Sequence, residues 1–372
     1  MSATTTRPTA PTPDQTASPT GAAATPAGAS GASGASGTAT LTLAKAITAA
    51  LHDAMAADEK VLLMGEDIGR LGGVFRVTDG LQATFGEDRV VDTPLAEATI
   101  LGAAIGLALR GYRPVCEIQF DGFVYPAFSQ IVSQLAKMPA RLAGAGQLPV
   151  VVRIPYGGGI GAVEHHSESP EAYFAHTAGL RVISPATPQD AYWMLRQSLT
   201  QPDPVIVMEP KRRYWDKGAV DTSAAALAAA PGLHSARVAR PVSDARVSEG
   251  GAVTVVAYGP TVRVALDAAL AAAEEGVELE VVDLRSLSPL DVGVVEASAR
   301  RTGRVVVVHE APVFLGMGAE VAARVTESCF HSLEAPVLRV GGFSVPYPAA
   351  RIEEHYLPDA ERLLDAVDRV LA

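Results

Sequence analysis

The sequence predicts a two-domain α/β protein in which each domain is built on a mostly parallel β-sheet covered by helices. Three observations indicate this class. The chain has 372 residues, more than one domain usually holds, and 48% of them are hydrophobic, which is enough for two buried cores. Short apolar runs alternate with segments of helical spacing, a pattern typical of strands buried on both faces. The pattern is interrupted once, between residues 216 and 250, and then resumes.

Residues 41–215 are expected to form the first domain. The preceding residues, 1–40, consist mainly of Thr, Pro, Ala, Gly and Ser, and a segment with so little apolar surface is expected to be a disordered low-complexity tail. Thr42 is a suitable N-cap for a helix whose apolar residues begin at Leu43 and recur at helical spacing. The expected strands cover residues 61–64, 90–91, 114–120, 150–154, 181–183 and 205–208, and the expected helices cover residues 98–110, 127–142 and 190–199.

Residues 251–372 are expected to form a second, smaller α/β domain. The segment before it, residues 216–250, is rich in Ala and Ser and has little periodicity, so we expect a linker there. The two domains differ in sequence, so no internal repeat is indicated. The expected strands cover residues 253–257, 279–283, 305–308 and 337–340, and the expected helices cover residues 262–275, 291–301 and 318–328.

The composition argues against several classes of function. The formal net charge of -11 and the lack of Lys and Arg runs are unlike a nucleic-acid-binding surface, whereas an acidic surface suits a basic protein partner. Two cysteines, Cys116 and Cys329, are too few for a disulfide framework or a structural zinc site and indicate a reducing compartment. No secretory signal is evident, and the most apolar stretch, residues 98–109, is too short to cross a membrane. We therefore expect a cytoplasmic protein.

A glycine-rich segment and the polar run after it form the first candidate site. Residues 157–162 fit a dinucleotide-binding pattern only weakly, because the polar run 164–169 follows them in place of a helix. We interpret the glycines as a flexible loop that brings backbone close to a ligand or partner. The adjacent His165 and His166 leave three interpretations open: metal ligands, a solvated polar loop, or a histidine that exchanges protons near neutral pH.

Glu97 is the second candidate. It lies in or beside the first turn of the helix expected at residues 98–110, where a glutamate that only complements the helix dipole is common. The residues that follow are almost wholly apolar, so the helix is expected to be buried on all sides. A carboxyl group in a buried first turn has a raised pKa unless it is paired. Gly102 and Gly106 on one face would let another backbone approach closely.

Several ordered motifs resemble the beta subunits of the decarboxylating component of 2-oxo acid dehydrogenase complexes. The resemblance covers nearly everything from Leu41 to the C-terminus, and its segments around Gln119 and His166 resemble the branched-chain type more than the pyruvate type. The motifs that carry it are 91–97 (VDTPLAE), 117–131 (EIQFDGFVYPAFSQI), 166–176 (HSESPEAYFAH), 182–185 (VISP), 204–210 (PVIVMEP) and 309–312 (HEAP).

The resemblance implies a thiamine-diphosphate-binding (pyrimidine-domain) parallel-sheet fold followed by a transketolase C-terminal-like α/β domain. It also implies two catalytic residues. Glu97 corresponds to the glutamate that hydrogen-bonds the aminopyrimidine ring of thiamine diphosphate, and His166 corresponds to the histidine implicated in passing the acyl group to lipoyl-lysine. Leu95, Gln119 and Phe123 correspond to residues around the pyrimidine. Phe123 replaces a residue that is often tyrosine in branched-chain relatives, so a hydroxyl is lost.

The resemblance also implies partners. The sequence contains no Gly-Asp-Gly segment, which in this family helps to bind the divalent cation of the diphosphate. We therefore expect no metal site in this chain, magnesium supplied mainly by an alpha subunit, and an assembly of two alpha with two beta chains. Further expected partners are a lipoyl acyltransferase core, which would dock on acidic residues such as Glu353 and Glu354, and a branched-chain 2-oxo acid. Ser198 and Gln201 leave open whether a structural monovalent cation is bound.

Other functions remain alternatives at this point. The nearest is a pyruvate or acetoin dehydrogenase beta subunit, in which the chemistry is the same and only the acyl pocket differs. A non-catalytic assembly subunit would retain the fold without needing Glu97. The most distant alternative is a metal-dependent hydrolase that uses His165 and His166.

Overall fold

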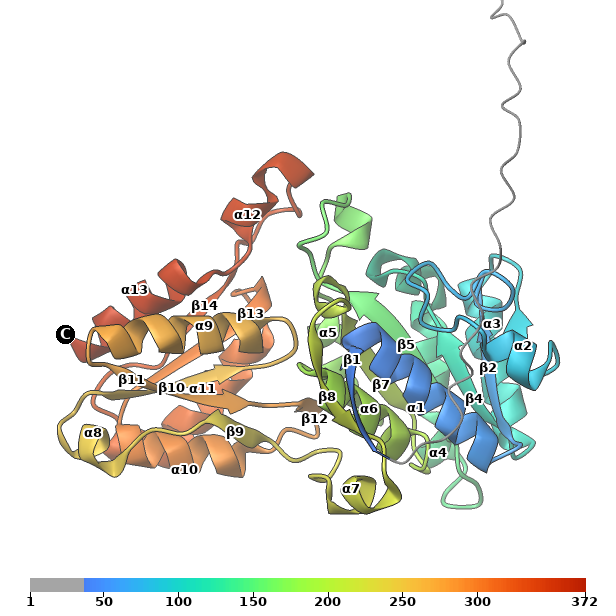
Figure 1. Cartoon of the computed structure of the whole chain (residues 1–372), viewed down its shortest axis with the longest axis horizontal. Coiled ribbons are helices and arrows are strands. Elements are labelled where there is room, and N and C mark those ends of the chain that lie inside the picture. The colour runs from blue at the N-terminus through green and yellow to red at the C-terminus, as the bar shows by residue number, and fades with distance from the viewer. Residues whose placement is uncertain (1–36) are drawn as a thin grey trace, which may run out of the picture. The chain divides into compact units, whose positions relative to one another are not determined.

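The computed structural model of the chain describes residues 37–372 and contains two large sheets, one in each half of that region (Figure 1). The first sheet has seven strands in the order β12-β6-β7-β5-β4-β2-β3, and all neighbouring pairs are parallel except β12 with β6. A mostly parallel sheet confirms the predicted fold class. Its strands are β2 (Val61–Gly65), β3 (Val90–Asp92), β4 (Arg113–Glu117), β5 (Val151–Tyr156), β6 (Arg181–Ile183), β7 (Val205–Pro210) and β12 (Ser286–Ser288).

Helices cover both faces of the first sheet because successive strand residues point to opposite sides. Val61 and Leu63 of β2 belong to the core cluster that contains α1 and α6, whereas Leu62 and Met64 belong to the cluster that contains α3. Thr42 caps α1 as predicted, and its side chain accepts a hydrogen bond from the Lys45 backbone amide at 3.2 Å. The helices of this half are α1 (Leu43–Ala57), α2 (Leu81–Phe85), α3 (Glu97–Leu109), α5 (Glu171–Ala175) and α6 (Pro188–Ser198).

The prediction of a single helix at residues 127–142 is wrong. The segment is divided into a 3₁₀-helix η1 (Asp121–Ala127), a π-helical stretch η2 (Gln130–Leu135) and a short α4 (Met138–Arg141). Proline lacks an amide hydrogen and its ring clashes with the preceding turn, so it disfavours a continuous helix. Pro126 lies inside η1 and Pro139 lies in the first turn of α4.

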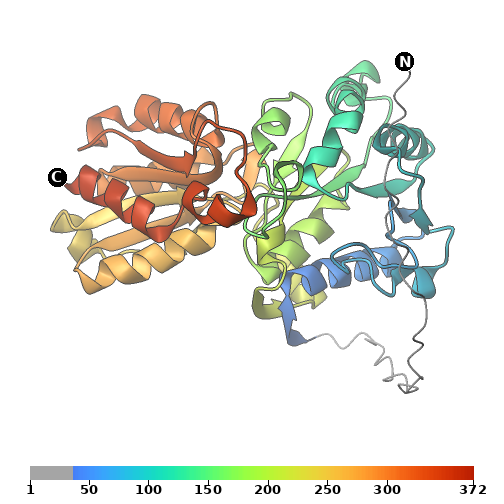
Figure 2. The same cartoon turned by 90° about the horizontal axis from the view of Figure 1, so that it is seen from above.

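The C-terminal half is built on a five-stranded sheet in the order β14-β13-β10-β11-β9, parallel except for β9 (Figure 2 shows this half in yellow to red). Helices α9 and α13 pack on one face and α10 and α11 on the other, as the core clusters indicate. Helix α13 was not predicted from the sequence. The elements are β10 (Ala252–Ala257), α9 (Thr261–Glu274), β11 (Glu278–Asp283), α10 (Val292–Thr302), β13 (Val305–Pro312), α11 (Met317–Cys329), β14 (Leu338–Gly342), α12 (Glu353–Tyr356) and α13 (Ala360–Leu371).

The expected linker, residues 216–250, contains four short elements. Strand β8 pairs antiparallel with β1 (Thr38–Thr42), and β9 forms an edge of the C-terminal sheet. Of the tail expected at residues 1–40, all but the last four residues lie outside the described part of the chain. The elements between residues 216 and 250 are β8 (Lys217–Asp221), α7 (Ala224–Ala229), β9 (Arg237–Arg240) and α8 (Asp244–Ser248).

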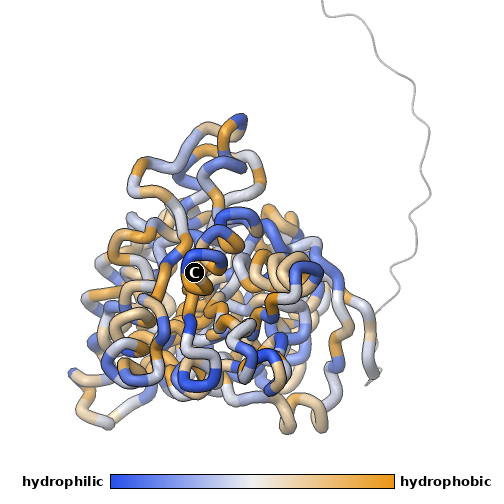
Figure 3. The backbone as a smooth tube through the Cα atoms, turned by 90° about the vertical axis from the view of Figure 1, so that its left-hand side faces the viewer, coloured by the Kyte–Doolittle hydropathy of each residue, from blue (hydrophilic) through white to orange (hydrophobic). Residues whose placement is uncertain are grey.

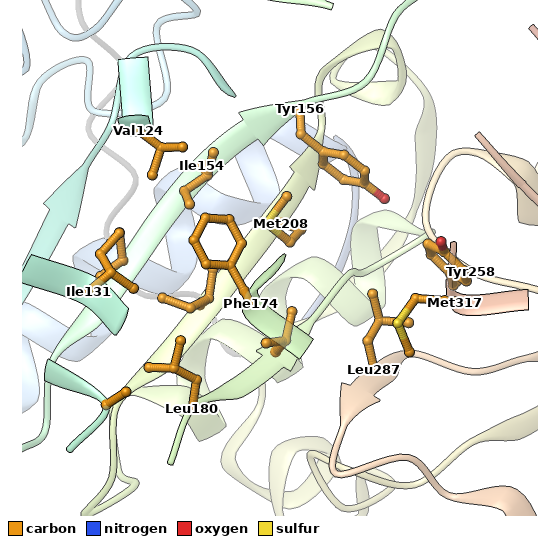
Figure 4. Packing of buried hydrophobic residues seen from close by; sticks show 14 of the residues in the cluster. Val124, Ile131, Ile154, Tyr156, Phe174, Leu180, Met208, Tyr258, Leu287 and Met317 are labelled. Atoms are coloured by element: carbon orange, nitrogen blue, oxygen red, sulfur yellow. The ribbon is translucent and has the colours of Figure 1, made fainter. Parts of the chain in front are cut away.

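One hydrophobic cluster extends from the first sheet into the C-terminal half. Phe174 and Met208 of the first half belong to the same buried cluster as Leu287 and Met317, and Figure 4 shows these side chains together. Along the backbone, apolar stretches concentrate inside the molecule and many outer turns are hydrophilic (Figure 3). The two sheets therefore share part of one core. Within residues 37–372, no helix has the length and apolar character needed to cross a membrane.

Candidate active site

The candidate residues gather at the carboxyl ends of the parallel strands. Glu66 and Asp67 directly follow β2, Glu97 starts the helix after β3, and Gln119 follows β4. The loop after β5 carries His166. Ligands of open parallel sheets bind outside the carboxyl ends of the strands, so this edge is the expected place for a site.

Glu97 and Glu66 form a pair of buried carboxylates. Glu97 is 7% exposed and Glu66 is 9% exposed. Burial is the main cause of the raised pKa of Glu66, and the carboxylates of Glu97 and Asp67 raise it further, while the Ala96 backbone amide opposes the shift. The Oε1 atom of Glu66 has no hydrogen-bond partner among residues 37–372.

Sequence reasoning did not identify Glu66. A carboxylate that follows a strand resembles any polar turn residue, and no motif marks it. The available signal was its position at the end of a strand that was predicted to be buried. Since parallel strands end at one edge, Glu66 could have been placed near Glu97 by that argument.

Gln119 is linked to this acidic pair through Asp67, and Leu95 lies two residues before Glu97 in the sequence. The Gln119 side-chain amide donates a hydrogen bond to Asp67 Oδ2 at 3.1 Å, so Gln119 is linked to the group that surrounds Glu66. Leu95 precedes α3, and its side chain is 77% exposed. A leucine this exposed contributes little to the core of this chain.

His166 is held in an aromatic group. Its ring stacks on Phe120 with ring centroids 4.0 Å apart, and Phe123 approaches edge-on at 5.0 Å. The Nδ1 atom of His166 lies 2.8 Å from the His165 carbonyl oxygen. A carbonyl only accepts hydrogen bonds, so Nδ1 is the donor in this contact and Nε2 is the ring nitrogen left for other partners. The structure thus brings Phe123 and His166 together.

The geometry of the polar run 164–169 matches neither a dinucleotide-binding site nor a metal site. The loop leads into a single 3₁₀ turn, Glu164–His166, instead of the helix that would bind a pyrophosphate. Within residues 37–372, no group of three or more His, Cys, Asp and Glu side chains is placed to hold a metal ion. His165 Nδ1 pairs with Glu164 Oε1 at 3.5 Å on the surface.

Helix α3 is not buried on all sides, contrary to the expectation from its apolar sequence. Ile100 and Leu101 are buried, but Gly102 and Gly106 are exposed. A Cβ atom placed on either glycine would meet nothing within 4 Å. The helix that carries Glu97 therefore presents a smooth face of small and apolar residues, where another chain can approach its backbone closely.

A cavity of about 130 Å³ lies between the two halves, close to the histidine loop. Its lining includes Ser167 and Glu168 from the loop and Glu310 from the end of β13. Burial raises the pKa of a neighbouring group, Glu171, to about 8. The carboxylates of Glu66 and Glu97 do not line this cavity.

The chain resembles proteins of known classes along most of its length. Residues 39–216 match the transketolase pyrimidine binding domain and residues 244–363 match the transketolase C-terminal domain. It is 59% identical over 332 residues to "Pyruvate dehydrogenase E1 component subunit beta" of Leifsonia xyli subsp. xyli, which covers 89% of this chain and 95% of that protein. It is 56% identical over 336 residues to "3-methyl-2-oxobutanoate dehydrogenase subunit beta" of Mycobacterium tuberculosis, covering 90% and 93% respectively.

A solved structure supports the fold. A "Split gene transketolase, inactive beta4 tetramer" aligns with a TM-score of 0.68 at 23% sequence identity, over 89% of this chain and 98% of that one. The matches to relatives of both the pyruvate and the 3-methyl-2-oxobutanoate type confirm the predicted family. This chain belongs to the family of E1 beta subunits of 2-oxo acid dehydrogenase complexes.

Proposed function

We propose that this chain is the beta subunit of a thiamine-diphosphate-dependent dehydrogenase of branched-chain 2-oxo acids. It would act in the cytoplasm, decarboxylating the 2-oxo acid and transferring the acyl group to lipoyl-lysine. The observation that carries the proposal is the buried pair Glu66 and Glu97 at the ligand-binding edge of the first sheet. The branched-chain preference rests on the resemblance of the segments around Gln119 and His166, and a pyruvate-type enzyme is the alternative.

The residues at this edge fit one end of the cofactor. The free Oε1 of Glu66 and the carboxylate of Glu97 offer acceptors to the amino group and a protonated ring nitrogen of an aminopyrimidine. The same acidic group, with Asp67, would repel a diphosphate. This fit at one end alone supports an alpha subunit that supplies magnesium and holds the diphosphate. The exposed glycine face of α3 gives that second chain, or a second beta chain, a place to pack.

Thiamine diphosphate, when bound, supplies the electron sink that decarboxylation requires. Glu97 would hold a proton at the pyrimidine ring, and burial strengthens that contact because little water competes for it. Glu66 would keep a second acceptor near the same ring. The aromatic rings of Phe120 and Phe123 fix the orientation of His166, whose Nε2 is free to take or give a proton during acyl transfer.

The proposed partners need one correction. Docking of the acyltransferase core on Glu353 is wrong, because Glu353 is only 6% exposed and its carboxylate is occupied by hydrogen bonds within the chain. Exposed acidic residues such as Glu354 remain for that contact. A monovalent cation also stays a proposal, since Ser198 and Gln201 bond within the chain, to the carbonyl oxygens of Met194 and Gln197.

The test is co-expression with an alpha subunit, followed by a panel of 2-oxo acids. We expect kcat/KM for 3-methyl-2-oxobutanoate to exceed that for pyruvate by about tenfold or more, the range that one or two methyl groups contribute in an apolar pocket. The reverse preference would identify a pyruvate-type enzyme. Calorimetry on the isolated beta chain should detect only weak cofactor binding. Tight, magnesium-dependent binding by that chain alone would contradict the shared site.

A further inference from the structure

The loop that carries His166 is closed at its base. The Gly157 amide donates to the Glu168 carbonyl oxygen at 2.9 Å, so residues 157–168 leave and rejoin the protein at one point. Asp121 of the first half secures that point, because its Oδ2 accepts the Glu168 amide at 2.8 Å. These bonds fix the ends of the loop but not its glycine-rich part, where Gly159 has a positive φ of 84°.

Two carboxylates of the C-terminal half bind that glycine-rich part. Glu310 Oε1 accepts the Gly158 amide, Glu353 Oε1 accepts the Gly159 amide at 2.7 Å, and Glu353 Oε2 accepts the Gly161 amide at 3.0 Å. Figure 1 shows the α12 segment, which begins at Glu353, beside this loop. We call Glu310 and Glu353 the carboxylate clasp.

The two carboxylates of the clasp are buried and have further partners. Glu310 is 2% exposed and Glu353 is 6% exposed. Tyr347 donates its hydroxyl proton to Glu353 Oε1 at 2.7 Å, and Arg212 Nε lies 3.7 Å from Glu310 Oε2. A Cβ at position 158 would overlap the Tyr347 hydroxyl, so a larger residue there would displace the Tyr347 side chain from Glu353. A hydrogen bond from a backbone amide to a carboxylate is roughly twice as strong as one to a neutral acceptor. Three such hydrogen bonds therefore hold the loop firmly.

The backbone amides that the clasp binds lie close to His166 along the chain. Only four residues lie between Gly161 and His166, and Gly122 of η1 packs closely against the His165 backbone. Without the clasp, a loop with several glycines would sample many backbone conformations. The position of the His166 ring thus depends on Glu310 and Glu353, which belong to the other half of the chain and lie 152 and 194 residues after the glycines Gly158 and Gly159.

We propose that Glu353, together with Glu310, is a positioning residue that fixes the loop 157–168 and so sets the place of His166 for acyl transfer. The proposal rests on the proposed function. It assigns the C-terminal half a part in catalysis that requires no contact with cofactor or substrate.

The experiment compares Glu353→Gln with Glu361→Gln in the assembled alpha–beta complex. Both variants replace one glutamate of the C-terminal half with glutamine. Glu361 is exposed and, within residues 37–372, has no hydrogen bond or ion pair with the loop 157–168. Hydrogen exchange is measured on peptides that cover residues 157–168. Decarboxylation is measured with an artificial electron acceptor, and acyl transfer is measured with a free lipoyl domain.

For Glu353→Gln we expect amide hydrogen exchange in the loop to be about tenfold faster, since the variant weakens the two hydrogen bonds that backbone amides donate to residue 353. We expect kcat for transfer to the lipoyl domain to fall about tenfold, with KM for the 2-oxo acid and artificial-acceptor turnover within about twofold of wild type. Tyr347→Phe, which removes one bond from Glu353 and keeps its charge, should shift exchange and transfer in the same direction by less. Glu361→Gln should match wild type.

Unchanged loop exchange in Glu353→Gln would overturn the proposal. Faster exchange with wild-type transfer, or an equal loss in both half-reactions, would overturn it as well. If wild type decarboxylates no 2-oxo acid, the proposed function fails, and the exchange data still decide whether the carboxylate clasp holds the loop.

Discussion

Glu66 and Glu353 are both buried glutamates at the ends of strands or loops, yet their surroundings differ. Glu66 is 9% exposed and has a carboxylate oxygen without a partner in the described residues. Glu353 is 6% exposed, and both of its oxygens accept hydrogen bonds from backbone amides. Burying an unsatisfied carboxylate costs free energy, whereas a fully bonded one stabilises the fold.

The difference distinguishes a carboxylate that is available to bind a ligand from one whose hydrogen bonds hold the backbone in place. Asp121 belongs with Glu353, because it accepts Lys211 Nζ at 2.6 Å and the Glu168 amide. Glu97 belongs with Glu66, since the two interact electrostatically at the open edge of the sheet. Substitutions of the two kinds should therefore affect different measurements.

The largest expected effect is on activity. Replacing Glu97 with Gln keeps its volume but removes the carboxylate, and kcat of the assembled enzyme should fall by roughly 10² to 10⁴, the usual contribution of a positioned proton-transfer group. Steady-state turnover of the 2-oxo acid measures it. The matched control is Glu87→Gln, an exposed glutamate in the same half. Wild-type activity in Glu97→Gln would favour the non-catalytic assembly subunit.

A large effect on stability is expected for Lys211→Met. Lys211 is 1% exposed and pairs with Asp121, and burial raises the pKa of Asp121 while it lowers that of Lys211. Removing the lysine leaves a buried carboxylate without its partner, which should lower the free energy of unfolding by roughly 3–5 kcal/mol. Urea unfolding measures the change. Asp121→Asn in the same chain should recover part of the loss, and no recovery would mean that packing, not charge, is responsible.

The smallest expected effect has a pH signature. Because the pKa of Glu66 is raised, the folded state binds its proton more tightly than the unfolded state does. The stability from this proton is complete below the pKa of an unfolded glutamate and is lost as the pH rises through the folded pKa. At pH 7, Glu66→Gln should therefore melt higher than wild type, by on the order of 2 °C. The gain should shrink as the pH is lowered to about 4. A Tm difference between Glu66→Gln and wild type that stays the same from pH 4 to pH 8 would show that the pKa of Glu66 is not raised in the folded state.

The regular elements could be predicted well from the sequence. Strand β2, helix α3 and the Thr42 cap follow from local apolar spacing and capping chemistry, and the structure confirms them. The prolines at positions 126 and 139 disfavour one long helix between residues 127 and 142, and this signal was present in the sequence. Strand β12 could not be predicted, because its sequence Ser-Leu-Ser contains only one apolar residue and its extended form depends on pairing with β6.

The candidate site was predictable only in part. Motifs singled out Glu97 and His166, and the structure brings each to the same sheet edge, while their roles stay predictions. Glu66 was missed because nothing local distinguishes it from a turn residue. The burial of Glu353 was missed because its partners, the amides of Gly159 and Gly161, lie almost two hundred residues earlier.

The core shared by the two sheets has a consequence for how such a protein changes over evolutionary time. Met317 and Leu287 pack in one cluster with Phe174 and Met208, so a volume change on either side is felt by both halves. A substitution that changes the volume of one of these side chains should therefore be tolerated best when a side chain across the boundary changes in the opposite sense.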